Sequence, residues 1–336
     1  MSVDPFAALA QPDGVRSALS TVFGRARIGP IVALTGGATT ASVYRIEVGG
    51  RWYLLRIEGQ PSPLRNPHQY ASMRIAAEAG IAPKILYVDE AARIVVTDFI
   101  EQVALEAYPG GPPALARALG ELLARVQATE VFPCFVEYPD IVARLFAHVR
   151  RTGLFAGGVL DQHVERLELL RGAYQASSSR SVSSHNDVVP NNIFYDGRRL
   201  WLIDWESAYC NDPLVDVAIM LDGIARSPEL EEVLLGAWLG RTPDESIRAR
   251  LDVVRAITRL YYAGVFLSAS AAVSWVKEET DLSVPSAVDF QRAINAGRLK
   301  AGTAEAKHIL GKMFLASFLS GVPTPGFDAA VEAVCS

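Results

Sequence analysis

The segment from Ser183 to Glu206 restricts the possible folds of this 336-residue chain more than any other part of its sequence. It contains two strand-like runs separated by Asp196-Gly197, which is a strong signal for a hairpin turn. In a hairpin centred just after this turn, residues whose numbers sum to about 396 face each other, which places Asn192 opposite Asp204. Directly paired residues lie about 5 Å apart at Cβ. The sequence therefore predicts an amide and a carboxylate close together at the open end of one hairpin.

The polar residues of this segment have the chemistry of a phosphoryl-transfer site. Oxygen ligands from Asn192 and Asp204, with the remaining positions filled by water and phosphate, suit Mg²⁺. Asp187 lies a short loop before the hairpin, where a free carboxylate can accept the proton of an attacking hydroxyl. The spacing His185-x-Asp187-x4-Asn192, followed by a metal-binding aspartate, is the pattern of kinases. A surface hairpin whose polar residues only cap turns is the simpler alternative. Against it, Asp204 ends an apolar run, where an unpartnered charge would be costly.

The stretch resembles the aminoglycoside phosphotransferase and choline kinase family of small-molecule kinases. The resemblance rests on the His-x-Asp-x4-Asn pattern, on the Ile-Asp-Trp-Glu run that ends at Glu206, and on the Asp-Pro…Asp-Val-Ala segment between Asn211 and Ala218. It extends from about Leu34 to Ala218 and implies a protein-kinase-like fold that uses ATP. Two roles stay open for Glu206, which are assistance in metal or substrate binding and a solvated carboxylate after a strand.

The resemblance also implies a role for each of the other polar residues. By this likeness Asp187 is the catalytic base, and His185 braces the loop that carries it. Asn192 and Asp204 hold Mg²⁺. Asp216 is expected to anchor the catalytic loop by hydrogen bonds rather than to contact the substrate.

The rest of the chain fits an α+β fold of the protein-kinase type, with a small antiparallel sheet lobe before a larger helical lobe. Apolar alternation and turn signals predict strands at 31–34, 42–48, 52–57, 84–88 and 93–99, and a helix at 68–79. After Gly110 the apolar spacing becomes helical, apart from one β segment between about 181 and 205. We therefore expect a nucleotide-binding lobe over residues 1–100 and a catalytic and substrate lobe over residues 101–336.

Five residues of the small lobe are expected to contact ATP: Gly36, Gly37, Thr39, Thr40 and Arg56. A glycine turn with small hydroxyl residues lets backbone N–H groups approach phosphate oxygens, although a plain turn before a strand has the same sequence. Arg56 alternates with apolar neighbours, so its side chain should point away from theirs. Most kinases have lysine at this position, and in having arginine there the chain resembles choline and ethanolamine kinases. Its planar fork can bind phosphate oxygens bidentately.

The sequence does not determine which side chain pairs with Arg56. In kinases a helix glutamate pairs with it, but the spacing back from Gly80 places Gln69 at that position, so either Gln69 bonds to Arg56 or another acid does. The connector from Asp98 to Ile100 is expected to offer backbone groups to the adenine. The missing helix acid also motivates an alternative, a catalytically weak or inactive nucleotide-binding regulator of the same fold. A metal-assisted hydrolase fits less well, because it leaves the glycine turn and Arg56 without a role.

Composition excludes some partners. A formal net charge of −5 gives no positive field for nucleic acid. The cysteines Cys134, Cys210 and Cys335 are far apart, odd in number and without metal-ligand spacing, so reduced thiols in the cytoplasm are expected. The uncharged run from Leu260 to Val276 is shorter than a typical membrane span, which favours a buried helix and no membrane partner.

The expected acceptor is a small molecule with a hydroxyl group. Choline- or ethanolamine-like amino-alcohols, aminoglycosides and sugars are all compatible with the resemblance, and the sequence does not separate them. A cationic amine would favour aromatic faces and carboxylates. The aromatic residues Tyr261, Tyr262 and Trp275 have a spacing that suits helix packing, so none of them is assigned to the substrate.

Overall fold

Five antiparallel strands form the sheet of the small lobe in the computed structural model, which describes residues 6–7, 9–34, 41–59, 66–176, 180–272, 278–321 and 331–332. Their order across the sheet is β1-β2-β3-β5-β4. The turn between β2 and β3 is Gly49-Gly50, whose φ angles of 59° and 77° favour glycine. All five predicted strands are present, as β1 Ile28–Ala33, β2 Ser42–Val48, β3 Arg51–Ile57, β4 Ile85–Asp89 and β5 Ile94–Asp98.

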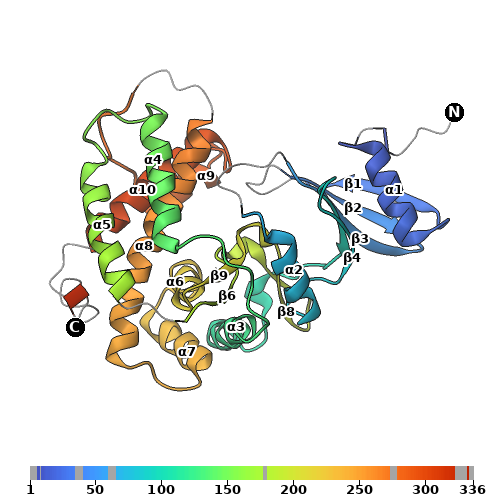
Figure 1. Cartoon of the computed structure of the whole chain (residues 1–336), viewed down its shortest axis with the longest axis horizontal. Helices are drawn as coiled ribbons and strands as arrows, with labels where there is room; N and C mark the ends of the chain where they lie inside the picture. The colour runs from blue at the N-terminus through green and yellow to red at the C-terminus, as the bar shows by residue number, and fades with distance from the viewer. Residues whose placement is uncertain are drawn as a thin grey trace.

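Helix α1 (Pro12–Phe23) lies across one face of this sheet (Figure 1). Its apolar residues Val15 and Leu19 pack with Leu55 of β3 in the core of the small lobe. Because successive strand residues point to opposite faces, Arg56 is directed away from this core, as the alternation predicted. The opposite face of β3 is therefore available to line a pocket.

The larger lobe is mostly helical and is built around α8 (Glu245–Ala271), which packs against α4, α5, α6 and α10. Leu260, Ala263 and Leu267 of α8 are buried, as expected for the uncharged run, whose residues 273–276 lie outside the described residues. Within the described chain, no helix is long and apolar enough to cross a membrane. The remaining helices are α3 Gly111–Gln127, α4 Tyr138–Arg151, α5 Asp161–Ala176, α6 Leu214–Gly223, α7 Pro228–Leu239, α9 Ala287–Asn295 and α10 Ala304–Gly321.

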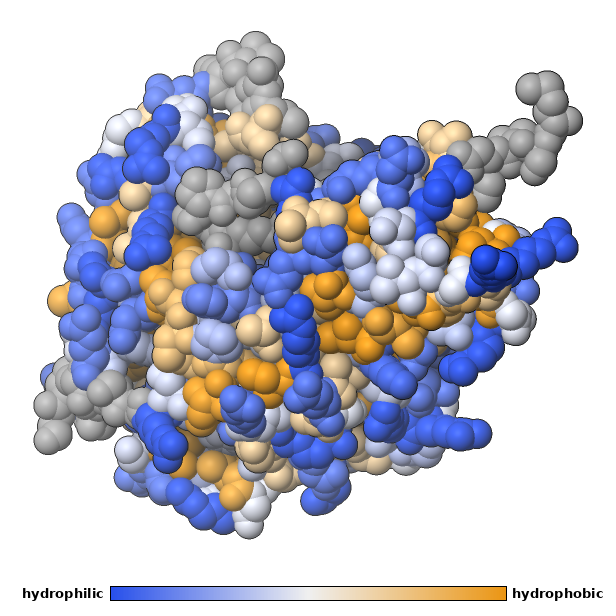
Figure 2. All heavy atoms as spheres, turned by 45° about the vertical axis from the view of Figure 1, so that its right-hand side comes forward, coloured by the Kyte–Doolittle hydropathy of each residue, from blue (hydrophilic) through white to orange (hydrophobic). Residues whose placement is uncertain are grey.

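Each lobe has its own hydrophobic core. Buried residues of the small core run from Phe6 to Val96, and those of the large core run from Ala76 to Phe318. Helix α2 (Gln69–Glu78) ends in the large core, so the chain crosses between the two cores before the end of the sheet. Figure 2 shows hydrophilic residues over much of the visible face, with apolar surface gathered where the small lobe comes forward. The lobe boundary near residue 100 stays a prediction.

The segment with the kinase-like motif forms short strands and single helical turns within the large lobe. Strand β6 pairs with β9, and β7 pairs with β8. Two 3₁₀ turns, η2 and η3, interrupt the strands and carry polar residues of the motif. The bounds are β6 Val182–Ser184, η2 Pro190–Asn192, β7 Ile193–Tyr195, β8 Leu200–Leu202, η3 Trp205–Ser207 and β9 Tyr209–Asn211, and a further 3₁₀ turn, η1, is Leu105–Ala107.

The predicted register of the hairpin was wrong by one residue. Tyr195 pairs with Leu200, so paired numbers sum to 395, and Asn192 does not face Asp204 across a ladder. The reason is the turn, in which the Asp196 carboxylate accepts hydrogen bonds of 2.8 Å from the backbone N–H groups two and three residues later. This contact favours a four-residue loop between the strands. The backbone N–H of Ile203 nevertheless donates to the carbonyl of Asn192 at 3.0 Å, which keeps the two strand ends together.

The prediction of reduced cysteines was also wrong. Cys134 and Cys210 form a disulfide with their Cα atoms 5.0 Å apart, and Cys335 lies outside the described residues. The two residues are 76 positions apart, but the backbone N–H of Cys210 donates to the carbonyl of Pro133 at 3.1 Å. Separation along the chain therefore did not reflect separation in space. A cytoplasmic location stays a prediction.

Candidate active site

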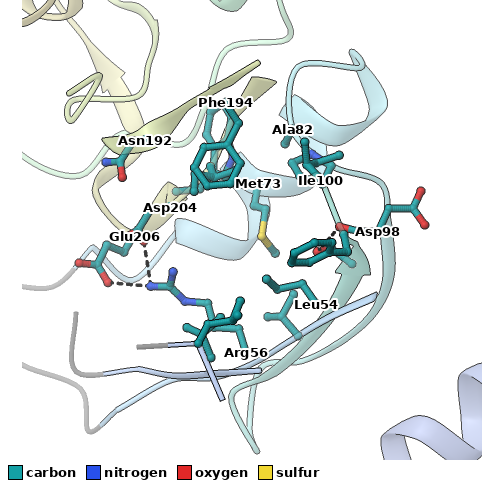
Figure 3. A pocket seen from close by; sticks show the side chains of 18 of the residues that line it. Leu54, Arg56, Met73, Ala82, Asp98, Ile100, Asn192, Phe194, Asp204 and Glu206 are labelled. Atoms are coloured by element: carbon teal, nitrogen blue, oxygen red, sulfur yellow. Dashed lines mark hydrogen bonds and ion pairs between the residues drawn. The ribbon is translucent and has the colours of Figure 1, made fainter. Parts of the chain in front are cut away.

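A cavity of about 640 Å³ lies between the two lobes. The small lobe contributes residues of β2, β3 and β5, and the large lobe contributes residues around β7 and η3. One end is polar, with Arg56, Asn192, Asp204 and Glu206, and the other end is mainly apolar (Figure 3). The cavity therefore has separate surroundings for charged and for apolar parts of a ligand.

Arg56 connects the two lobes at the polar end. Its Nη2 lies 2.8 Å from Oδ1 of Asp204 and 3.2 Å from Oε2 of Glu206 (Figure 3). Its Nε lies 2.6 Å from Oε1 of Glu58. Burial lowers the pKa of the Arg56 guanidinium, but the carboxylates outweigh it, Asp204 most and then Glu58 and Glu206, so the pKa lies above its ordinary value. The guanidinium is a permanent cation that faces the pocket.

Asn192 and Asp204 face the same end of the cavity although they are not paired on the hairpin. Asp204 adopts a left-handed backbone conformation, with φ of 63°, at the point where β8 passes into η3. The side-chain nitrogen of Asn192 donates to Asp187, so its amide oxygen is directed toward the pocket (Figure 3). An amide oxygen and a carboxylate are oxygen donors that suit Mg²⁺.

These residues fit a magnesium ion that completes its coordination with other ligands. Among the described residues, no group of three or more His, Cys, Asp or Glu side chains is placed to hold a metal. Mg²⁺ usually keeps several waters and binds through one or two carboxylates together with substrate phosphates. Two protein oxygens beside a cavity are therefore sufficient for a metal that arrives with a nucleotide.

Asp187 adjoins this end of the cavity through Asn192. Its Oδ2 accepts a hydrogen bond of 2.9 Å from Nδ2 of Asn192, and its Oδ1 accepts one of 2.9 Å from the hydroxyl of Tyr262. Burial raises the pKa of Asp187, while His185 and these two donors oppose the rise. Both carboxylate oxygens are thus held by donors from separate elements.

Tyr262 is a residue that the sequence did not assign to the site. It belongs to α8, 75 residues after Asp187, and its pKa is raised by burial and by the neighbouring carboxylate, so the hydroxyl stays a donor. Its helical spacing with apolar neighbours is the same as that of a core aromatic residue. No local motif could have identified it.

Backbone and side-chain hydrogen bonds fix the loop that carries Asp187. The carboxylate of Asp216 accepts from the backbone N–H groups of His185, at 2.8 Å, and Asn186, at 2.7 Å. The buried His185 ring donates from Nε2 to the carbonyl of Ile203 at 2.9 Å and packs on Trp205 with ring centres 4.6 Å apart. The loop is therefore attached both to α6 and to the strand that precedes Asp204.

Asn186 explains the sharp bend of this loop. Its φ of 61° lies in the left-handed region, where asparagine is tolerated better than most residues. Its side-chain nitrogen donates to the carbonyl of Ser207 at 2.9 Å, and its oxygen accepts from Asn211 at 2.7 Å. These bonds hold the bend just before Asp187.

The remaining predicted residues either line the cavity or lie outside the residues that the structure describes. Gln69, Asp98 and Ile100 line the cavity, with Asp98 at the end of β5 and Ile100 on the connector that follows it. The backbone N–H of Asp98 is already used in a hydrogen bond of 2.9 Å to the carbonyl of Lys84. The predicted phosphate-loop residues lie outside the described residues: Gly36, Gly37, Thr39 and Thr40.

The apolar end of the cavity was not predicted residue by residue. Leu54, Met73, Phe99, Ile100 and Phe194 line it, and they come from β3, α2, the connector and β7. Side chains from four separate elements meet here, with no sequence motif to join them. Their apolar surfaces suit a flat heterocycle better than they suit a charged group.

The two lobes, the cavity between them and the polar loop beside it define the class of kinase-like phosphotransferases. A model of the phosphotransferase enzyme family matches residues 30–251, which is more than half of the chain. The protein belongs to this family.

Solved structures with the same fold include a choline/ethanolamine kinase family protein from Mesorhizobium loti. It is 21% identical, with a TM-score of 0.67, and the alignment covers 96% of this chain and 98% of that one. A structure of LicA in complex with AMP is 15% identical, with a TM-score of 0.63, over 91% of this chain and 98% of that one. At these identities the likeness shows the fold alone.

A local sequence match reaches higher identity. The protein LicA of Haemophilus influenzae (strain ATCC 51907 / DSM 11121 / KW20 / Rd) is 40% identical over 58 residues, which are 17% of this chain. This chain thus spans only 22% of the length of that relative.

Proposed function

We propose that this protein is an ATP-dependent kinase that transfers the γ-phosphoryl group to a hydroxyl of a small molecule. The observation that carries the proposal is the junction of three groups at one end of the inter-lobe cavity. These are the cation of Arg56, the oxygen pair of Asn192 and Asp204, and the carboxylate of Asp187, which is bonded to Asn192. Phosphoryl transfer needs positioning and charge stabilisation of this kind.

In this proposal Asp187 is the base. Its carboxylate accepts the proton of the acceptor hydroxyl as the acceptor oxygen forms its bond to the γ-phosphorus, and the bond from that phosphorus to the ADP oxygen breaks. The hydrogen bonds from Asn192 and Tyr262 hold the carboxylate in one orientation. His185 and Asp216 act at a distance, by fixing the loop on which Asp187 stands.

The other residues bind the nucleotide. Arg56 is placed to contact phosphate oxygens, and the apolar end of the cavity is placed to receive the adenine beside Ile100. Asn192 and Asp204 would hold Mg²⁺, which supplies positive charge to the phosphates when it is bound. Glu206 contacts Arg56 at the same end and is assigned to orienting that cation.

For the acceptor we propose an amino-alcohol of the choline or ethanolamine type, ahead of aminoglycosides and sugars. Tyr262, which bonds to Asp187, stacks on Phe314 with ring centres 5.5 Å apart, and Phe266 packs on both rings. Aromatic faces next to the base are suited to a cationic amine. Relatives of the same fold include proteins described as choline kinases and a spectinomycin phosphotransferase solved with ADP and spectinomycin, so both acceptor classes belong in the test.

The test is ADP release from ATP and Mg²⁺ in the presence of single acceptors. The panel contains choline, ethanolamine, a sugar and an aminoglycoside, and the phosphorylated product is identified by mass spectrometry. We expect turnover with at least one amino-alcohol and none with Asp187→Asn, which keeps the shape of the side chain but cannot accept the proton. ATP binding without turnover on any acceptor would instead favour the nucleotide-binding regulator.

A further inference from the structure

The sequence left open which acid pairs with the strand cation, because α2 has glutamine where kinases have glutamate. Within α2 the one acidic residue is Glu78, at the last position. The carboxylate at Nε of Arg56 comes instead from Glu58, at 2.6 Å. Glu58 was not among the residues that the sequence assigned to the site.

Glu58 is fixed on the sheet itself. It directly follows β3, and its backbone N–H donates to the carbonyl of Arg93 at 2.9 Å, which prolongs the pairing of β3 with β5 by one residue. Residues two apart on a strand point to the same face, so Arg56 and Glu58 share one face by strand geometry. Their side chains are 15% and 6% exposed, so the pair is shielded from water.

The contact with Glu58 sets the direction of the guanidinium. The guanidinium is planar and rigid, so a partner at Nε fixes where the terminal nitrogens point. With Nε at Glu58, the terminal Nη2 reaches across the pocket to Asp204 and Glu206 on the large lobe. Without the acceptor at Nε, the contacts of Nη2 with Asp204 and Glu206 would remain, but the rotation of the guanidinium about them would be less constrained.

We propose that Glu58 is the positioning residue of Arg56 and takes the place of the helix acid of other kinases. The inference rests on the proposed function, since it assumes that Arg56 binds the phosphates of ATP. Because cation and acid stand on one strand, their pairing does not depend on the position of α2. The nucleotide site is therefore set in place without a movement of that helix.

The test compares dissociation constants for ATP with Mg²⁺, measured by titration calorimetry. Glu58→Ala removes the acceptor at Nε, and we expect binding to weaken about tenfold, the factor for one lost charge-assisted hydrogen bond. Glu58→Gln keeps an oxygen acceptor at Nε, so it should bind within about threefold of the native protein, because the hydrogen bond is retained. If Glu58 acted only through its charge, the dissociation constants of both variants would change in the same direction and by similar amounts.

One mutant background and one control variant complete the design. In Arg56→Met, Glu58→Ala should cause no further loss, since the residue that it positions is gone. The matched control is Glu90→Ala, which removes the acid of the exposed pair between Glu90 and Arg74 in the same lobe and should leave binding unchanged. If Glu58→Ala does not fold, Glu58→Asp is used in its place. The shorter side chain withdraws the carboxylate from Nε, so the same weakening of ATP binding is expected.

The outcomes separate this inference from the proposed function. Native-like binding by Glu58→Ala, equal losses in the alanine and glutamine variants, or an unreduced loss in the Arg56→Met background would overturn the role of Glu58 while the kinase proposal stands. An absence of nucleotide binding by the native protein would overturn both.

Discussion

The carboxylate of Asp187 is held from both sides, by Asn192 of η2 at Oδ2 and by Tyr262 of α8 at Oδ1. A base must be oriented toward the proton that it accepts, and small errors of position are costly in rate. The two donors come from elements that meet only in the folded lobe. Catalysis by Asp187 is therefore expected to depend on residues that never contact the phosphates.

Tyr262→Phe tests this dependence. The change keeps the ring and removes the hydroxyl, so we expect kcat to fall about tenfold, as for the loss of a hydrogen bond to a charged group, with KM for ATP unchanged. Steady-state kinetics measures both constants. The control is Tyr138→Phe, because the buried Tyr138 hydroxyl has no hydrogen-bond partner among the described residues. Equal effects of the two substitutions, or a change confined to KM for ATP, would contradict the role of Tyr262.

The sequence predicted those candidate groups that share a local motif. Asp187, Asn192 and Asp204 were predicted because their spacing and their chemistry are joined in one segment. Tyr262 and Glu58 were missed for different physical reasons. Tyr262 has the pattern of a core residue on a distant helix, and Glu58 contacts Arg56 from the end of the same strand, whereas the partner was expected on another element.

The helices of the large lobe pack closely, and the crossing of α3 and α7 tolerates little change. Helix α3 crosses α7 so closely at Gly120 that a Cβ there would overlap the carbonyl oxygen of Leu234 and lie 3.0 Å from Cβ of Ala237. The contact is between backbone atoms, which cannot rotate away as a flexible side chain can. Glycine is thus required at this crossing for its size, and α3 also contacts β6, which precedes the loop that carries Asp187.

Gly120→Ala should lower the free energy of unfolding. Alanine gains about 1 kcal/mol of helix propensity over glycine, while overpacking of this kind costs about 1–3 kcal/mol or more. We expect a net loss of about 1–2 kcal/mol by urea denaturation, because the clash involves backbone. Gly172→Ala in α5 is the matched control, since no atom lies within 4 Å of the added Cβ, and it should be neutral or stabilising. Stabilisation by both substitutions would show that α3 and α7 do not approach this closely.

The strands of the small lobe were predicted well because alternation, glycine turns and apolar runs are local signals. The register of the β7-β8 hairpin was not, because the Asp196 side chain selects the loop length through its own hydrogen bonds. The disulfide between Cys134 and Cys210 was missed for another reason. It joins segments that become neighbours only when the loop after α3 packs beside β9.

At the scale of the whole molecule, two cores meet at one cavity, and the large core includes buried titratable groups. His163 of α5 is buried and packs on Phe318 of α10, with ring centres 5.9 Å apart. Burial lowers the pKa of His163, because the charged form loses its hydration. The folded large lobe therefore favours the neutral imidazole.

The contribution of His163 to stability should consequently decrease in mild acid. As pH falls below about 6.5, the unfolded chain takes up a proton at His163 that the folded protein does not, so the free energy of unfolding falls. Urea denaturation between pH 7.5 and pH 5.5 measures this slope. His163→Leu should reduce the slope. An unchanged slope in His163→Leu would show that this residue does not couple folding to pH.

In the proposed kinase, Arg56, Asn192 and Asp204 form one site for a nucleotide and its metal ion. The most direct measurement is calorimetric titration of ATP, with Mg²⁺ and with EDTA, into the native protein and into Asp204→Asn. We expect at least about tenfold tighter ATP binding with Mg²⁺ in the native protein, and a loss of most of that difference in the variant. The same dependence on Mg²⁺ in both proteins, or none in either, would contradict it.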